Sequence, residues 1–146
     1  MKRLNEAGLR YIMGWEKLRL KVYDDGYGNP TIGYGHLVDS FNHPNIDKSI
    51  AIEWLKNDVE IAECGVDKLV TVQLNQNQYN VLVSIIFNVG VGRFAKSKLR
   101  KLINSGASPK EVGELIKHAF ITSNGIQSNG LIERRKSDAE LYTKEV

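Results

Sequence analysis

The amino-acid sequence predicts an α+β fold, with a small antiparallel sheet beside a bundle of helices. Residues 18–36 alternate between apolar and polar types around a cluster of turn residues, which is typical of a glycine-rich hairpin. Most of the remaining chain carries apolar residues at helical spacing. At 146 residues, with no internal repeat and no break in composition, the chain fits a single domain, 1–146.

The first elements follow from the local pattern. Apolar residues at helical spacing predict a first helix over 1–16 that ends near Glu16. The alternation over 18–23 predicts a strand, the glycine- and proline-rich run 24–30 predicts a turn, and 31–34 predicts the returning strand.

The rest of the chain is expected to be mainly helical. A long helix over about 47–64 is predicted to stop at Gly65. Residues 74–79 have the form of a capping box, and the apolar run 81–89 behind them predicts a central buried helix. Shorter helices are expected near 97–105 and 109–120, then a polar loop over 122–130 and a last helix through 131–142.

Composition sets limits on cofactors, membrane insertion and partners. The single cysteine, Cys64, excludes an internal disulfide, and the three histidines share no metal-ligand spacing with it, so we expect neither a metal nor another cofactor. The amino-terminal residues 1–15 are too polar for a signal peptide or a membrane span, so we expect no stable membrane insertion. Basic residues cluster over 96–101 and 134–136, where they could meet nucleic acid or an anionic wall polymer. Solvated helix faces are the more common explanation of such clusters.

Two acidic residues carry the candidate chemistry. Glu16 falls at the carboxyl end of a predicted helix, where the macrodipole disfavours a negative charge and so favours the protonated acid that a general acid requires. A solvated glutamate paired with Lys17 or Arg19 is the competing interpretation. A second acid, ionised, on the same cleft would complete the apparatus of glycoside hydrolysis. Spacing alone leaves open whether Asp24 or Asp25 is that acid.

These residues resemble a known signature. Glu16, Asp25, Thr31 and the segment TIGYGH at 31–36 are similar to the active-site motif of the phage-type lysozymes, or endolysins, of glycoside hydrolase family 24. Residues 74–94 resemble the family's central helix, and 130–142 its closing helix. The resemblance covers nearly the whole chain and selects Asp25 over Asp24.

The resemblance implies a lysozyme-like architecture. A sheet lobe at about 17–46 would be joined by the connecting helix, 47–64, to a helical lobe made of 66–146 and the first helix, with the active-site cleft between the lobes. It also implies hydrolysis of the β-1,4 bond between N-acetylmuramic acid and N-acetylglucosamine in peptidoglycan. Glu16 would be the general acid, Asp25 would activate or orient a water, and Thr31 would help to hold that water, an inverting arrangement.

Further positions are carried by the same resemblance. His36 and Asp58 match an ion pair that steadies the small lobe, and Asp58 lies within an apolar helical stripe where a carboxylate needs a partner. Either Arg134 or Arg135 could bridge to Glu16. Four positions match residues that line or approach the family's cleft: Leu37, Phe87, Asn88 and Ser97. For Phe87 core packing competes with that interpretation, and for Ser97 a helix cap does.

Three departures from the family pattern affect the subsites rather than the reaction. Pro30 stands where many relatives have an aromatic residue before the threonine, and Phe120 replaces a tryptophan that is usual near the end of the penultimate helix. Glu114 replaces a neutral polar residue that contacts substrate in some members.

The resemblance also implies a biological setting. The protein would be a monomer that accumulates in the host cytoplasm, acts on the periplasmic wall after a holin opens the inner membrane, and binds no nucleic acid. A prophage copy or a bacterial toxin of the same fold would have a similar sequence. A lytic transglycosylase, a wall-binding or virion structural module, and a nucleic-acid binder are the alternative functions.

Overall fold

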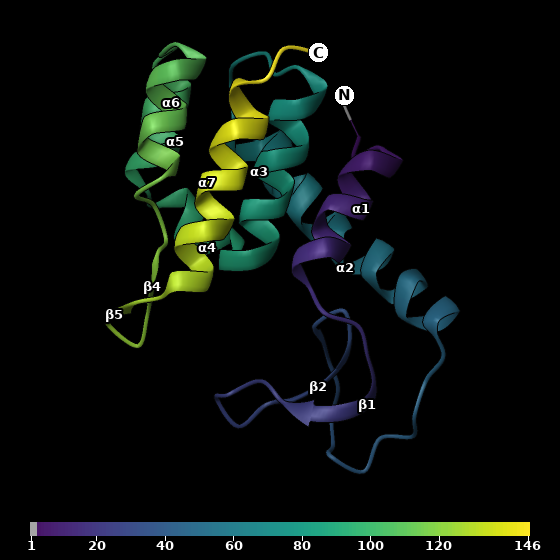
Figure 1. The fold of residues 1–146 in the computed structure, drawn as a ribbon. Coiled ribbons are helices and arrows are strands. Elements are labelled where there is room, and N and C mark those ends of the chain that lie inside the picture. The colour runs from purple at the N-terminus through teal and green to yellow at the C-terminus, as the bar shows by residue number, and fades with distance from the viewer. Residues whose placement is uncertain (1–2) are drawn as a thin grey trace.

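The structure is a computed structural model that describes residues 3–146. A small sheet lies apart from a larger body of helices, and the long helix α2 (Lys48–Leu69) leads from the segment after the sheet into that body (Figure 1). The predicted α+β class is therefore confirmed. One continuous hydrophobic core fills the helical body and extends to Tyr34 beside the sheet.

The sheet has three antiparallel strands in the order β1 (Arg19–Asp24), β2 (Pro30–Gly33) and β3 (His36–Leu37). Tyr23 pairs with Thr31, and the register shifts between Arg19 and Tyr23. Such a shift is typical of a β-bulge, so the side chains of β1 do not keep the simple alternation that the sequence predicts. The predicted hairpin is present, with the acidic turn at its tip.

The first helix, α1 (Glu6–Trp15), begins later than the predicted range 1–16, at Glu6, but it ends where the sequence predicts, with Glu16 as its carboxyl-terminal cap residue. Asn5 caps the other end, because its Oδ1 accepts a hydrogen bond from the Gly8 amide at 2.9 Å. The same oxygen accepts a hydrogen bond of 2.8 Å from Nδ2 of Asn80 in the neighbouring helix. The cap therefore also fixes α1 against the centre of the molecule.

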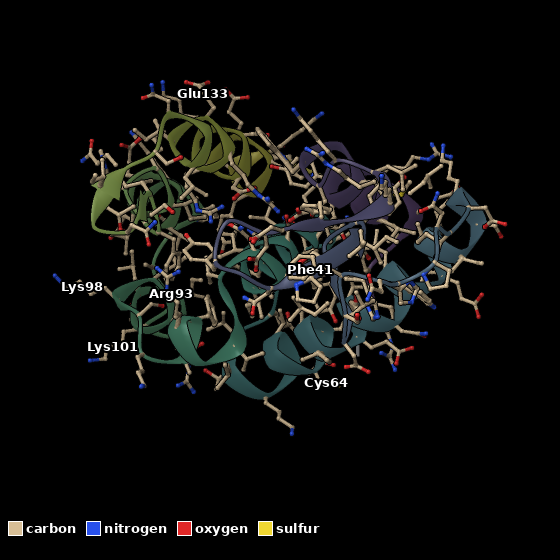
Figure 2. All side chains as sticks on the ribbon, turned by 90° about the horizontal axis from the view of Figure 1, so that it is seen from below. Phe41, Cys64, Arg93, Lys98, Lys101 and Glu133 are labelled. Atoms are coloured by element: carbon tan, nitrogen blue, oxygen red, sulfur yellow. The ribbon has the colours of Figure 1, made fainter. Side chains whose placement is uncertain are left out.

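The predicted end of the connecting helix is wrong. α2 does not stop at Gly65 but continues to Leu69. Gly65 is needed for close packing instead, because a Cβ at this position would lie 3.2 Å from Cγ2 of Val91. Cys64, next to it, lies exposed on the outer face of the helix (Figure 2).

The central helix, α3 (Gln76–Val89), agrees with its prediction. The Asn75 side chain accepts from the Gln78 amide at 2.8 Å, and Gln78 Oε1 accepts from the Asn75 amide at 3.0 Å, which confirms the capping box. Residues 79–86 are all buried, as expected for a helix surrounded by others.

The carboxyl-terminal half holds four more helices and a second small sheet. The helices are α4 (Val91–Ala95), α5 (Lys98–Asn104), α6 (Pro109–Ile116) and α7 (Asn129–Thr143). The helix predicted over 109–120 ends early, at Ile116, and Phe120 beyond it has a left-handed φ of 55°. Of the helices in the described part of the chain, none is long and apolar enough to cross a membrane.

The segment predicted as a polar loop contains a hairpin, β4 (Thr122–Ser123) paired with β5 (Ile126–Gln127). Asn124 and Gly125 between the strands have φ values of 54° and 78°. Two successive left-handed residues of this kind are the conformation of a type I′ hairpin turn, for which Asn-Gly is strongly preferred. The dipeptide was therefore a hairpin signal.

Two glycines of α1 give a matched test of its packing. A Cβ on Gly8 would lie 2.6 Å from both Cγ of Asn80 and Cδ1 of Leu4, whereas a Cβ on Gly14 would meet nothing within 4 Å. Gly8→Ala should lower the free energy of unfolding by about 1–3 kcal/mol through overpacking. Gly14→Ala should raise it by about 0.5–1 kcal/mol through helix propensity. Chemical denaturation measures both, and equal effects of the two changes would contradict this account of α1.

Candidate active site

A cleft of about 590 Å³ separates the sheet lobe from the helical body. Its polar lining comes from both parts and contains Glu16, Tyr23, Asp25, Tyr27, Thr31, His36, Asp58 and Asn88. Its apolar lining contains Leu37, Ile61, Ala62, Ile86, Phe87 and Val91. Acids, other hydrogen-bonding groups and apolar side chains thus line one hollow, as in many ligand sites.

Glu16 enters the cleft from the end of α1. Arg134 Nη1 donates a hydrogen bond of 3.2 Å to Glu16 Oε1, and the arginine side chain is only 7% exposed. The guanidinium carbon also lies 5.8 Å from the centre of the Trp15 ring. The alternative between two arginines is thereby resolved: Arg134 contacts Glu16. A Cβ on Gly35 would lie 3.9 Å from Oε2, an ordinary contact distance, so the left-handed φ of 83° is what favours glycine at this position.

Asp25 enters the cleft from the tip of the hairpin. Its Oδ1 accepts hydrogen bonds from the backbone amides of Tyr27 at 2.8 Å and Asn29 at 3.2 Å, and Oδ2 accepts one from Asn29 Nδ2 at 3.0 Å. The Asn29 side chain and then the Tyr27 amide lower the pKa of Asp25 below its ordinary value. Asp25 is therefore held in one orientation and stays ionised to lower pH than a free aspartate.

Asp24 has a different task. Its Oδ1 accepts hydrogen bonds from the amides of Gly26 at 2.8 Å and Gly28 at 2.9 Å, and it is not among the residues that line the cleft. Both glycines have left-handed φ values, so Asp24 fixes a turn that only glycine adopts easily. Of the two adjacent aspartates, Asp25 is the one that the structure places in the cleft.

Thr31 lies on β2, opposite Tyr23, and is 3% exposed. Its hydroxyl donates to the carbonyl oxygen of Asn29 at 3.1 Å. A hydroxyl that donates in this way still has lone pairs with which it can accept a hydrogen bond. Thr31 therefore presents an acceptor at the cleft wall.

The structure brings His36 and Asp58 together. His36 Nδ1 lies 2.8 Å from Asp58 Oδ2, and the imidazole ring centre lies 4.7 Å from that of Trp54. The contact links β3 to the middle of α2. It also supplies the partner that an aspartate in an apolar helical stripe requires.

Of the four further positions expected at the cleft, Leu37, Phe87 and Asn88 line it and Ser97 does not. The Ser97 hydroxyl accepts from the Arg100 amide at 3.1 Å and donates to the Phe94 carbonyl oxygen at 2.6 Å. Ser97 is therefore the amino-terminal cap of α5, as the competing interpretation held.

Sequence reasoning missed two tyrosines. Tyr23 pairs with Thr31, and directly opposed residues of a hairpin lie on the same face, so the predicted hairpin offered a signal for it. Burial, and then the charge of Glu16, raise the pKa of Tyr23. The Tyr27 hydroxyl lies 2.7 Å from Oγ of Ser123 in the second hairpin. No short-range pattern predicts that contact.

The cleft continues into a second hollow. This hollow has a volume of about 770 Å³ and shares Asp25, Tyr27 and Asn88 with the cleft. Its other walls include Arg93, Phe120 and the β4–β5 hairpin. Asn88 therefore lies where the two hollows meet.

In the part of the chain that the structure describes, the remaining charges form neither a metal site nor a uniform basic face. Residues 3–146 contain no group of three or more His, Cys, Asp or Glu side chains that could hold a metal ion. Lys98 and Lys101 point away from the body (Figure 2). Arg100 turns inward, where Nε donates to the Leu69 carbonyl oxygen at 3.0 Å and Nη1 to that of Ala95 at 3.1 Å. Part of this basic cluster is thus structural.

The hydrogen bonds at the hairpin tip predict the titration of Asp25. Asn29→Ala removes the side chain that contributes most to lowering the pKa of Asp25, so this pKa should rise toward its ordinary value. Carboxyl ¹³C NMR titration measures the change, with the exposed Asn42→Ala as a control that leaves the hairpin intact. An unchanged Asp25 titration in Asn29→Ala would contradict the assignment.

The chain is similar to proteins of known family. The chain matches the phage lysozyme family over residues 13–138. It is 37% identical over 145 residues to an endolysin of Bacillus phage B103, covering 95% of this chain but 53% of that protein, so it spans about half the length of that relative. It is 33% identical over 141 residues to an endolysin of Acyrthosiphon pisum secondary endosymbiont phage 1, covering 95% of this chain and 97% of that one.

A solved structure supports the fold independently. The muramidase domain of SpmX from Asticaccaulis excentricus superimposes with a TM-score of 0.91 at 28% identity, covering 99% of this chain and 100% of that one. The lysozyme-like fold expected from the sequence is thus confirmed. With a family match over most of its length and a relative that it covers almost completely, the chain belongs to the phage lysozyme family.

Proposed function

We propose that the protein is an endolysin that hydrolyses the β-1,4 bond between N-acetylmuramic acid and N-acetylglucosamine in bacterial peptidoglycan. The observation that carries the proposal is the pairing of two acids on one cleft, Glu16 held by Arg134 and Asp25 held ionised by its own turn. Two carboxyl groups in different environments on one cleft are the apparatus of glycoside hydrolysis.

In this mechanism the two acids have separate roles. Glu16 donates a proton to the glycosidic oxygen as the bond to the leaving sugar breaks. Asp25 accepts a proton from a water that attacks the anomeric carbon from the opposite face, and the Thr31 hydroxyl accepts a hydrogen bond from that water. The configuration at the anomeric carbon is then inverted. Arg134 keeps the Glu16 carboxyl group oriented toward the cleft.

Neighbouring residues support binding and the shape of the cleft. The contact between His36 and Asp58 steadies the small lobe against α2. Leu37, Phe87 and Asn88 contact the glycan strand. The cap contacts of Ser97 give no support to a direct role in substrate binding.

Two features favour this function over its alternatives. A lytic transglycosylase needs no second carboxylate to activate water, so the orientation of Asp25 and the acceptor at Thr31 favour hydrolysis. A wall-binding or virion structural module has no need of two carboxyl groups on one cleft, whereas Glu16 and Asp25 both line this one. A nucleic-acid binder would use free basic side chains, and Arg100 and Arg135 are engaged with protein groups.

The proposed setting follows from the endolysin relatives. The protein accumulates as a monomer in the host cytoplasm and reaches the periplasmic wall once a holin has opened the inner membrane. Lysis at the end of a phage cycle is the result. The proposal needs no cofactor.

Substitution of the two acids tests the mechanism. Glu16→Gln and Asp25→Asn should each slow the clearing of outer-membrane-permeabilised cells by at least about a hundredfold, because each removes a proton-transfer group. Asp24→Asn is the matched control, because an amide oxygen still accepts from Gly26 and Gly28 and the clearing rate should stay near that of the wild type. Equal clearing by all variants, or equal losses at positions 24 and 25, would contradict the assignment.

The chemistry of the released ends tests the reaction type. Hydrolysis predicts fragments that end in reducing N-acetylmuramic acid, which mass spectrometry of the digested wall identifies. A 1,6-anhydro end would show instead that the sugar's own hydroxyl replaced water, and the role given to Asp25 and Thr31 would be lost.

A further inference from the structure

The orientation of the Asn88 amide is determined by a buried arginine. Arg135 is fully buried, and its Nη2 donates a hydrogen bond to Oδ1 of Asn88. A guanidinium group has donors and no acceptor, so the oxygen of the amide, rather than its nitrogen, must face Arg135. The amide cannot reverse without placing two donors against each other.

Arg135 in turn cannot move away from Asn88. Its Nη1 donates to Asp138 Oδ2 at 2.8 Å, and its Nε donates to the Ala119 carbonyl oxygen at 3.1 Å. The other carboxylate oxygen of Asp138 accepts from the Tyr11 hydroxyl at 2.6 Å. Groups from α1, α7 and the turn after α6 therefore hold the guanidinium plane in one position.

The contact of Oδ1 with Arg135 leaves the amide nitrogen of Asn88 available to donate toward the cleft. Asn88 lines both the active-site cleft and the second hollow. Within residues 3–146, no acceptor takes a hydrogen bond from Asn88 Nδ2, and this atom is not among the buried polar atoms without a partner. The side chain therefore offers two N–H donors, in a fixed direction, where the hollows meet.

We propose that Arg135 is a positioning residue that makes Asn88 an obligate hydrogen-bond donor to the acetamido carbonyl oxygen of a bound sugar. This inference rests on the proposed function. A sugar hydroxyl can either donate or accept, so it could pair with an amide in either orientation. A carbonyl or carboxylate oxygen can only accept, so a fixed donor at Asn88 selects specifically for groups of this kind. Asp25 lines the same two hollows, and its negative charge disfavours a carboxylate there. The neutral acetamido carbonyl is the acceptor that fits.

Asn88→Asp separates this role from a purely structural one. An aspartate still offers an oxygen to Arg135, in a charge-assisted hydrogen bond, but it has no donor for the cleft. If Asn88 served only to satisfy Arg135, Asn88→Asp would bind glycan like the parent protein. If Asn88 is a donor, glycan binding should weaken by about tenfold, the typical effect of one lost hydrogen bond.

Calorimetry on Glu16→Gln protein measures this binding without turnover, with peptide-free glycan strands as the probe. Asn77→Asp, on the same helix but outside the cleft, is the control for added charge. The tenfold loss should appear only in Asn88→Asp and should persist at high salt, which screens charge repulsion. Unchanged binding, or a loss that salt removes, would overturn the proposal. Failure of the Glu16→Gln protein itself to bind the strands would instead count against the proposed function.

Chemically altered strands identify the acceptor. On de-N-acetylated strands the parent's tenfold advantage over Asn88→Asp should be lost, because an ammonium group that can only donate replaces the acetamido carbonyl that accepts. On strands whose lactyl carboxyl groups have been reduced, the difference should remain. The opposite pattern would place the lactyl group, not the acetamido group, against Asn88 and overturn the assignment.

The role of Arg135 has its own test. Arg135→Lys keeps a positive charge beside Asp138 but loses the planar fork that reaches Asn88. KM should rise about tenfold with little change in kcat, because a contact made equally in the ground state and the transition state is weakened. A fall in thermal stability with unchanged KM would show a structural role alone. If this variant does not fold, the Asn88→Asp measurement decides.

Discussion

The buried ion pair between Arg135 and Asp138 is the interaction on which the site depends. Both side chains are fully buried, and burial raises the pKa of Asp138 and lowers that of Arg135, while their mutual attraction opposes both changes. Removal of one partner from such a pair typically costs about 3–5 kcal/mol, because the other charge is left without compensation. The pair therefore fixes α7 against α1 through Tyr11 and against α3 through Asn88.

Once α7 is fixed, the direction of Arg134, the residue before Arg135, is fixed as well. Adjacent residues on a helix are separated by about 100°, so Arg134 and Arg135 face different neighbours. Arg135 faces the interior, and Arg134 faces Glu16. Two nitrogen atoms of Arg134, Nε and Nη2, are buried without a partner in residues 3–146, which makes the Glu16 contact its main electrostatic compensation. The orientation of the candidate acid thus depends on a pair that does not touch it.

Sequence reasoning succeeded where structure is set by near neighbours. The capping box at Asn75, the end of α1 near Glu16 and the hairpin over 18–36 all follow from residues within a few positions of one another. The resemblance singled out Asp25, and the structure places it in the cleft. The choice between Arg134 and Arg135 could not be made, because both are buried in a helix whose inward face depends on partners far along the chain.

Each error also has a physical explanation. Glycine commonly ends a helix, so the sequence predicts a stop at Gly65, but close contact with Val91 is the reason for glycine at this position. The polar composition of residues 122–130 predicts a loop, but the Asn124-Gly125 pair within them is typical of a type I′ hairpin turn, which is what the structure contains. Tyr27 could not be identified from sequence, since its partner Ser123 lies 96 residues away.

The two acids, Glu16 and Asp25, are held in place by different parts of the molecule. Asp25 receives its donors from its own turn, so its ionisation does not require the helical body to be in place. Glu16 takes its orientation from α7. The hydrogen bond between Tyr27 and Ser123 joins the lobes near the second hollow, and Tyr27 is 61% exposed. A single hydrogen bond contributes only about 0.5–1.5 kcal/mol, so this contact between the lobes is weak, and neither acid depends on it for its own contacts.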